Sequence, residues 1–151
     1  MKKLLLTIFL LIFLNSCGFQ PIYSSKNLKQ FSLNITSIEG ENEINNLIKR
    51  NLKFYENDLY NKKFNLVVKT DYEKNILTKN KQGKTTDYEL VIKANFEINS
   101  DKNNYSVEII KQINIKSMDD VFQERQYEKS MKQNLVNTII DELINKISLM
   151  E

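Results

Sequence analysis

The sequence of 151 residues contains no histidine, no tryptophan, one proline and one cysteine. The absence of histidine excludes Ser-His-Asp and Cys-His catalytic arrangements and any metal site with a histidine ligand. Three glycines are present, and they form no glycine-rich phosphate loop. Paired carboxylates could still serve as acid and base, but Asp119–Asp120 and Asp141–Glu142 fall where helix surface charges are expected. We therefore expect no enzyme, no catalytic residues and no metal site.

The sequence also lacks a large excess of positive or negative charge. The chain has 22 Lys and Arg against 19 Asp and Glu, a net charge of +3, and loss of Lys2 and Lys3 with a leader would leave 3 − 2 = +1. A general nucleic-acid binder shows a basic excess on one face, so we expect no nucleic-acid partner. The length suits a single domain with one core.

The amino-terminal stretch is the most informative part of the chain. Lys2 and Lys3 precede an apolar run from Leu4 to Leu14, and Asn15–Ser16 lead into the only cysteine, Cys17. A membrane-spanning helix needs about 20 apolar residues, so this run is too short to be one. A charged start, a short apolar segment and a small residue before the cut are typical of a secretory signal peptide, which we place at 1–16.

The position of Cys17 resembles a bacterial lipobox, although Asn15 departs from the usual small or hydroxylated residue. In that interpretation Cys17 becomes the first mature residue and carries a covalent diacylglycerol and an N-acyl chain such as palmitate. The alternative is an ordinary signal peptide with a chance cysteine near its end. We expect a lipidated tether over 17–30 and a folded domain over 31–151, with no cofactor beyond the covalent lipid.

Alternation of apolar and polar residues predicts four strands in the folded domain. The first begins at Phe31 and ends near Ile38, before Gly40. Three longer runs follow, on Phe64 to Tyr72, Tyr88 to Ile98 and Tyr105 to Ile115, and two short polar connections predict an antiparallel meander. A few apolar residues interrupt the polar face of these strands and are either ordinary surface or a contact area. These residues are Val67, Leu77, Val91 and Ile110.

Two helices are predicted from spacings of three and four residues. The first carries Ile44, Leu47, Ile48, Leu52 and Tyr55 on one face. For the second, Ser117 to Asp120 fits a capping box, and a broad apolar stripe runs from Met131 to Ile147. Its charged first part, Gln123 to Lys129, is expected to be solvated or to break the helix. The order β-α-β-β-β-α predicts an α+β fold in two layers, with two helices on one face of a four-stranded, mostly antiparallel sheet.

The lipobox, the start Cys17-Gly18-Phe19-Gln20-Pro21-Ile22-Tyr23 and this element order resemble the LPS-assembly lipoprotein family, LptE. The most specific match is the pattern C-G-F-x-P-x-Y. The segment 46–52, Asn-Leu-Ile-Lys-Arg-Asn-Leu, is similar to the first helix of the family.

The resemblance implies an outer-membrane lipoprotein on the periplasmic face of a Gram-negative envelope. Family members plug the large LptD β-barrel, help to assemble it and bind lipopolysaccharide during its transport to the cell surface. A cluster of basic residues at the tip of a hairpin, Lys79, Lys81 and Lys84, is the candidate lipopolysaccharide site, because acidic groups favour closely spaced cations. Two alternatives remain: a free periplasm-facing structural or envelope lipoprotein without a barrel partner, and tip lysines that are only solvated.

Overall fold

The computed structural model describes residues 31–57, 60–101 and 103–150. The signal peptide, Cys17 and the tether predicted over residues 1–30 lie outside the described residues. The described part forms four strands and two helices in the predicted order. Their bounds are β1 Phe31–Gly40, α2 Asn42–Leu52, β2 Lys62–Lys79, β3 Thr85–Asn99, β4 Asn104–Lys116 and α3 Val121–Leu149, with a 3-10 turn at Lys53–Tyr55 after α2.

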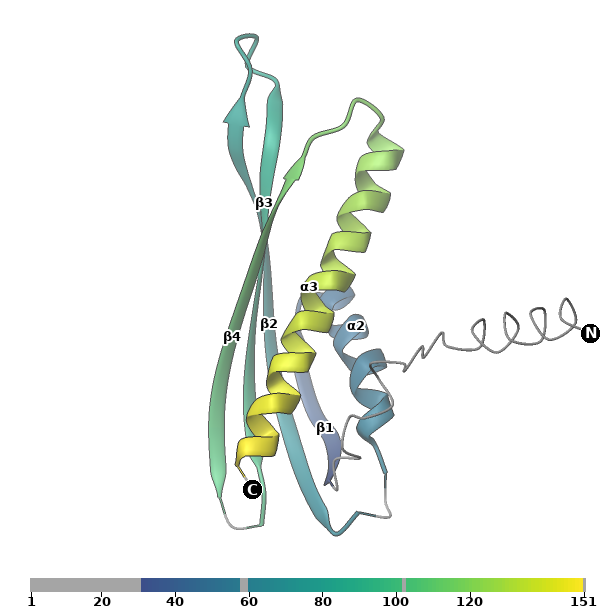
Figure 1. Ribbon diagram of the computed structural model, residues 1–151, viewed down its shortest axis with the longest axis vertical. Helices are drawn as coiled ribbons and strands as arrows, with labels where there is room; N and C mark the ends of the chain where they lie inside the picture. Colours follow the sequence, from purple (N-terminus) through teal and green to yellow (C-terminus); the bar gives the residue numbers. More distant parts are fainter. Residues whose placement is uncertain (1–30, 58–59, 102, 151) are drawn as a thin grey trace, which may run out of the picture.

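The strands form one sheet in the order β1-β2-β3-β4 (Figure 1). β1 and β2 are parallel, whereas β2–β3 and β3–β4 are antiparallel hairpins. α2 and α3 cover the same face, so the domain has two layers. The predicted α+β class, element order and mostly antiparallel sheet are therefore confirmed. The β2–β3 hairpin extends past the first turn of α3, which makes the molecule long and narrow at that end.

The core lies between the sheet and the two helices. Each strand contributes alternate residues to it, as the period of two requires; Leu66, Ile92 and Ile98 are fully buried. α3 contributes Ile139 and Leu143, also fully buried. The apolar stripes predicted from sequence therefore meet in one core.

The β1–α2 connection is fixed by a close approach to β2. Gly40 has φ +111°, and a Cβ there would lie 1.9 Å from the backbone oxygen of Thr70. Only glycine tolerates both conditions. The Thr70 hydroxyl also donates to Asn45 Oδ1 at 2.6 Å and accepts from the Glu41 N–H at 3.1 Å. These contacts place the start of α2 against β2.

α3 differs from the prediction at its start. The capping box beginning at Ser117 is wrong, because Asp120 is the N-cap and its carboxylate accepts hydrogen bonds from the N–H groups of Phe122 and Gln123. The charged part does not break the helix, which is continuous from Val121 to Leu149. None of the helices in the described ranges combines the length and apolar character needed to cross a membrane.

Candidate functional site

The tip of the β2–β3 hairpin carries the three lysines singled out from the sequence. Asn80 organises the turn: its backbone N–H donates to the Lys84 oxygen at 2.8 Å, and its side-chain oxygen accepts from the N–H groups of Gln82 and Lys84, both at 3.0 Å. Gly83 has φ +81°, the left-handed conformation that this tight turn requires. The tip is therefore a defined turn that presents its side chains outward.

The three lysines do not share one environment. Lys79 and Lys81 are exposed, and neither forms a hydrogen bond or ion pair through its side chain with a residue that the structure describes. Lys84 instead donates to Asp119 Oδ1 at 2.5 Å, which raises the pKa of Lys84 and lowers that of Asp119. This pair connects the hairpin to the segment before α3. An anionic ligand at Lys84 would compete with a carboxylate, whereas Lys79 and Lys81 have no such competitor in the described chain.

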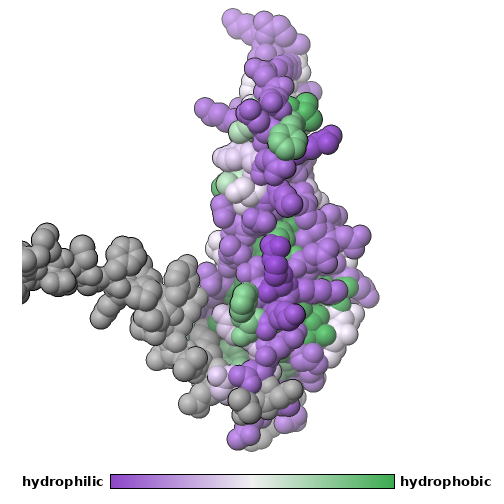
Figure 2. All heavy atoms as spheres, turned by 90° about the vertical axis from the view of Figure 1, so that its right-hand side faces the viewer, coloured by the Kyte–Doolittle hydropathy of each residue, from purple (hydrophilic) through white to green (hydrophobic). Residues whose placement is uncertain are grey.

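Exposed apolar side chains flank the same end of the molecule. Ile76 and Leu77 on β2 are 54% and 44% exposed, and Val121 and Phe122 in the first turn of α3 are 62% and 69% exposed. Figure 2 shows hydrophobic atoms on an otherwise hydrophilic surface in the upper, narrow part of the molecule. Cations and apolar side chains together give this end an amphiphilic character.

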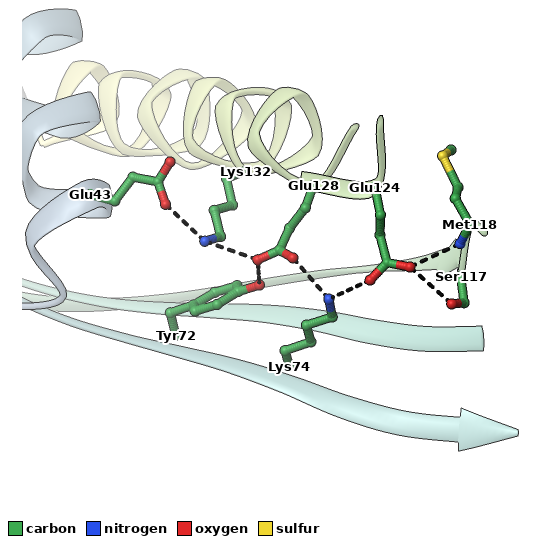
Figure 3. A network of polar contacts seen from close by, with 8 residues as sticks. All are labelled: Glu43, Tyr72, Lys74, Ser117, Met118, Glu124, Glu128 and Lys132. Atoms are coloured by element: carbon green, nitrogen blue, oxygen red, sulfur yellow. Dashed lines mark hydrogen bonds and ion pairs between the residues drawn. The ribbon is translucent and has the colours of Figure 1, made fainter. Parts of the chain in front are cut away.

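A chain of polar side chains attaches the first half of α3 to the sheet (Figure 3). Lys132 lies between Glu43 of α2, at 2.8 Å, and Glu128, at 3.1 Å. Glu128 accepts from the Tyr72 hydroxyl at 2.7 Å and from Lys74 at 2.9 Å. Lys74 continues to Glu124 at 3.2 Å. We call this set of six side chains the α3 polar network.

The network is closed at its far end by the β4–α3 connection. Glu124 Oε2 accepts from the Ser117 hydroxyl at 2.9 Å and from the Met118 N–H at 2.8 Å. Ser117 in turn donates its backbone N–H to the Thr86 oxygen of β3 at 2.8 Å. The network therefore joins both helices, β2 and the hairpin into one rigid support for the tip.

The electrostatics of the network follow from partial burial and charge pairing. Burial alone would raise the pKa of Glu128, but hydrogen bonds from Tyr72, Lys74 and Lys132 lower it to about 2. Burial and the bond to Glu128 raise the pKa of Tyr72. The ammonium groups of Lys132 and Lys74 also lie 4.1 Å from the ring centres of Tyr72 and Tyr88, within cation–π range. At neutral pH the network is charged and internally satisfied.

The sequence located the tip lysines but not this network. The solvated role expected for Gln123 to Lys129 is wrong for Glu124 and Glu128, whose side chains are only 17% and 16% exposed. Their partners on β2, Tyr72 and Lys74, lie at least 50 residues away along the chain. The spacing of Glu124, Glu128 and Lys132 by four residues was the available signal, because it places all three on one face of a helix.

The outer face of the sheet is mainly polar. Lys93 pairs with Glu73 at 2.6 Å and lies 4.0 Å from Asp71. Val91, one of the apolar interruptions noted in the sequence, is only 7% exposed, whereas Ile110 is 47% exposed. The face without helices thus carries charge pairs, with Ile110 among its exposed apolar residues.

No family model matches the chain, and no curated protein matches it. Solved structures do, and they define a class: the fold is LptE-like, that of small bacterial lipoproteins. The crystal structure of rare lipoprotein B from Shewanella oneidensis is 17% identical, with a TM-score of 0.55 over 80% of this chain and 98% of that one. The solution structure of lipoprotein B from Nitrosomonas europaea is 14% identical, with a TM-score of 0.55 over 83% and 89%. A minor lipoprotein from Acinetobacter baumannii is 18% identical, with a TM-score of 0.50 over 80% and 94%.

At these identities the likeness establishes the fold. It agrees with the fold expected from the resemblance of the amino-terminal motif, and it extends over nearly the whole length of the solved domains. The names of these structures describe lipoproteins, and none of them names an enzymatic activity.

Proposed function

We propose that this chain is a lipid-anchored protein of the outer membrane that plugs and helps to assemble an LptD-like β-barrel and binds lipopolysaccharide during its transport to the cell surface. The observation that carries the proposal is the combination of two independent features. The described domain has the fold of rare lipoprotein B, and the sequence before it carries the lipobox and the C-G-F-x-P-x-Y start.

The surface of the domain is suited to the inside of a barrel. A large barrel encloses a wet, polar lumen, and a plug there must present hydrated side chains while keeping its own apolar core closed. The outer face of the sheet does this with charge pairs such as Lys93–Glu73. The elongated shape allows the helices and the broad end of the sheet to remain at the periplasmic side while the hairpin reaches further in.

The hairpin tip fits the chemistry of lipopolysaccharide. Its lipid A part combines acidic groups with acyl chains, so a matching surface needs cations beside apolar side chains. Lys79 and Lys81 supply the cations, and Phe122 and Ile76 are among the exposed apolar residues at the same end. Lysine binds as a point charge without the fork of arginine, so we expect weak and salt-sensitive binding.

Lipid on Cys17 would hold the protein at the membrane. Each methylene buried in the bilayer contributes about 0.8 kcal/mol to anchoring. Gly18, in place of the aspartate that retains many lipoproteins in the inner membrane, agrees with sorting to the outer membrane.

Co-purification tests the proposal. The tagged full-length chain is extracted from native membranes in a mild detergent, and we expect a large β-barrel to accompany it in a one-to-one complex. An unrelated lipoprotein with the same tag is the control. Depletion of the chain should also lower the amount of assembled barrel. Normal barrel levels and no co-purified barrel would refute the proposal and favour a free periplasm-facing envelope lipoprotein.

A further inference from the structure

β1 is an edge strand with an open groove beside it. β2 pairs with one side of β1, and no other described strand pairs with its second side. α2 lies next to β1 (Figure 1), and its residues line the opposite wall of the groove. The groove has a volume of about 750 Å³ and is open to solvent. It is lined by Ile35 and Ile38 of β1, by Lys49, Arg50 and Lys53 on the other wall, and by Glu56.

Three cations of this groove lie close together, and none of them is paired with a residue that the structure describes. Lys49, Arg50 and Lys53 are exposed, and none of them forms an ion pair or hydrogen bond through its side chain with a described residue. Six lysines elsewhere in the described residues are instead paired with carboxylates. They are Lys74, Lys84, Lys93, Lys111, Lys132 and Lys146. A row of cations that no described residue pairs, beside a sheet edge that no described strand pairs, favours an anionic partner.

The spacing of the row identifies the kind of anion. Lys49 and Lys53 are four residues apart on a helical path, a rise of about 6 Å. Side chains on the same side of an extended peptide repeat about every 6.6 Å, since each residue advances about 3.3 Å. We propose that the groove between β1 and α2 binds an extended acidic segment of another protein, with carboxylates at alternate positions. Ile35 and Ile38, both half-buried, offer an apolar floor for the side chains between them.

Backbone hydrogen bonding along the β1 edge contributes only in part to binding of the acidic segment. The register of β1 against β2 shifts between Ile35 and Ser37, so the edge is bulged at Thr36. A bulge interrupts regular strand addition, which leaves the side-chain charges as the main source of specificity. Glu56 at the margin of the groove repels a further carboxylate and limits the length of the acidic stretch.

Other occupants fit less well. Residues 18–30 of this chain contain Lys26 and Lys29 and no acidic residue, so they lack the complementary charge. A phosphate concentrates its charge at one point, whereas these cations are spread along the helix. On β4, the strand at the other edge of the sheet, Lys111 is already paired with Glu142 at 2.6 Å. It is therefore less suited to bind a further carboxylate. The inference is independent of the barrel proposal, since it concerns a different surface.

The test uses the full-length chain in an uncharged detergent and a fluorescein-labelled peptide with blocked ends and the sequence Glu-Val-Glu-Val-Glu. Fluorescence anisotropy measures binding, and the peptide Gln-Val-Gln-Val-Gln is the neutral control. The groove variant carries Lys49→Gln, Arg50→Gln and Lys53→Gln. We expect this variant to bind the acidic peptide about tenfold more weakly than the unmodified chain does, the size of three exposed ion pairs. The unmodified chain should bind the neutral peptide no more tightly than the variant binds the acidic peptide.

A second variant removes the same charge elsewhere, through Lys69→Gln, Lys116→Gln and Lys129→Gln, all at exposed positions. It should bind the acidic peptide like the unmodified chain. Charge reversal guards against loss of folding. The variant with Lys49→Glu, Arg50→Glu and Lys53→Glu should gain binding to Lys-Val-Lys-Val-Lys.

Several results would overturn the inference. One is equal loss of binding in the groove variant and in the second variant. Another is binding of vesicles containing phosphatidylglycerol through the groove cations while the peptide does not bind, because the occupant would then be a lipid surface. A third is self-association in sedimentation that the groove variant abolishes, which would identify a second copy of the chain as the occupant.

Discussion

Replacing Glu128 by methionine should destabilise the domain more than any other single change in the α3 polar network. The carboxylate is bound by Lys132 at 3.1 Å, by Lys74 at 2.9 Å and by the Tyr72 hydroxyl at 2.7 Å. Its removal leaves the Lys132 side chain, 10% exposed, with Glu43 as its remaining carboxylate partner among the described residues. Breaking a buried ion pair by removing one partner costs about 3–5 kcal/mol, and we expect about 2 kcal/mol because Lys74 keeps Glu124 and water reaches the site.

The pKa of Glu128 gives the same order of magnitude. A value of about 2 in place of the ordinary 4.5 corresponds to roughly 3 kcal/mol at most, before screening by solvent. Because the pKa is lower in the folded state, this stabilisation is complete above about pH 5 and disappears as the pH falls toward 2. The difference in unfolding free energy between Glu128→Met and the unmodified chain should therefore shrink over that interval.

Denaturant unfolding followed by circular dichroism measures these unfolding free energies. In thermal unfolding at neutral pH, Glu128→Met should lower the Tm by about 8 °C. Lys132→Met is the matched variant, and its cost should be smaller, about 1 kcal/mol, because Glu128 retains Lys74 and Tyr72. The double variant should cost less than the sum of the two single changes. Strictly additive effects, or a loss below about 0.5 kcal/mol for Glu128→Met, would show that the network does not hold α3 on the sheet.

Three further predictions concern the anchor, the tip and the β1–α2 connection. Cys17→Ser should move the chain out of the membrane fraction while leaving the circular dichroism spectrum of the domain unchanged. Lys79→Glu, Lys81→Glu and Lys84→Glu together should weaken binding of lipopolysaccharide to the folded protein, measured by titration at low salt, and unchanged affinity would reject the tip as the site. Gly40→Ala should lower the unfolding free energy by about 3 kcal/mol or more, measured by denaturant titration, because the new Cβ meets the backbone of β2.

Local patterns predicted most of the fold. Alternation identified the strands because each of them has one face on the core, as Leu66 and Ile98 do. Helical spacing identified both helices for the same reason. The helix start was misplaced because Ser117 and Asp120 both suit an N-cap, and the choice depends on Glu124, which binds the Ser117 hydroxyl and leaves Asp120 to cap.

The candidate site was only partly accessible from sequence. A cluster such as Lys79 and Lys81 is visible because its members are close along the chain. The pairing of Lys84 with Asp119, 35 residues away, depends on how the hairpin approaches the β4–α3 connection. That no described residue pairs with the side chains of Lys49 and Arg50 is likewise a property of the folded surface, since acidic residues far away in the sequence could have approached them.

The parallel pairing of β1 with β2 has a consequence for the order of folding. Phe31 pairs with Lys62, 31 residues further along, whereas Asn99 and Asn104 across the β3–β4 turn are neighbours. Contacts between distant residues close large loops and form slowly. A chain delivered from its amino terminus presents β1 and α2 first, yet both need β2, and the core needs Ile139 of α3. We therefore expect the β2–β3–β4 meander to nucleate folding, with β1 docking last, so that the earliest segment to emerge is the one most dependent on protection from aggregation.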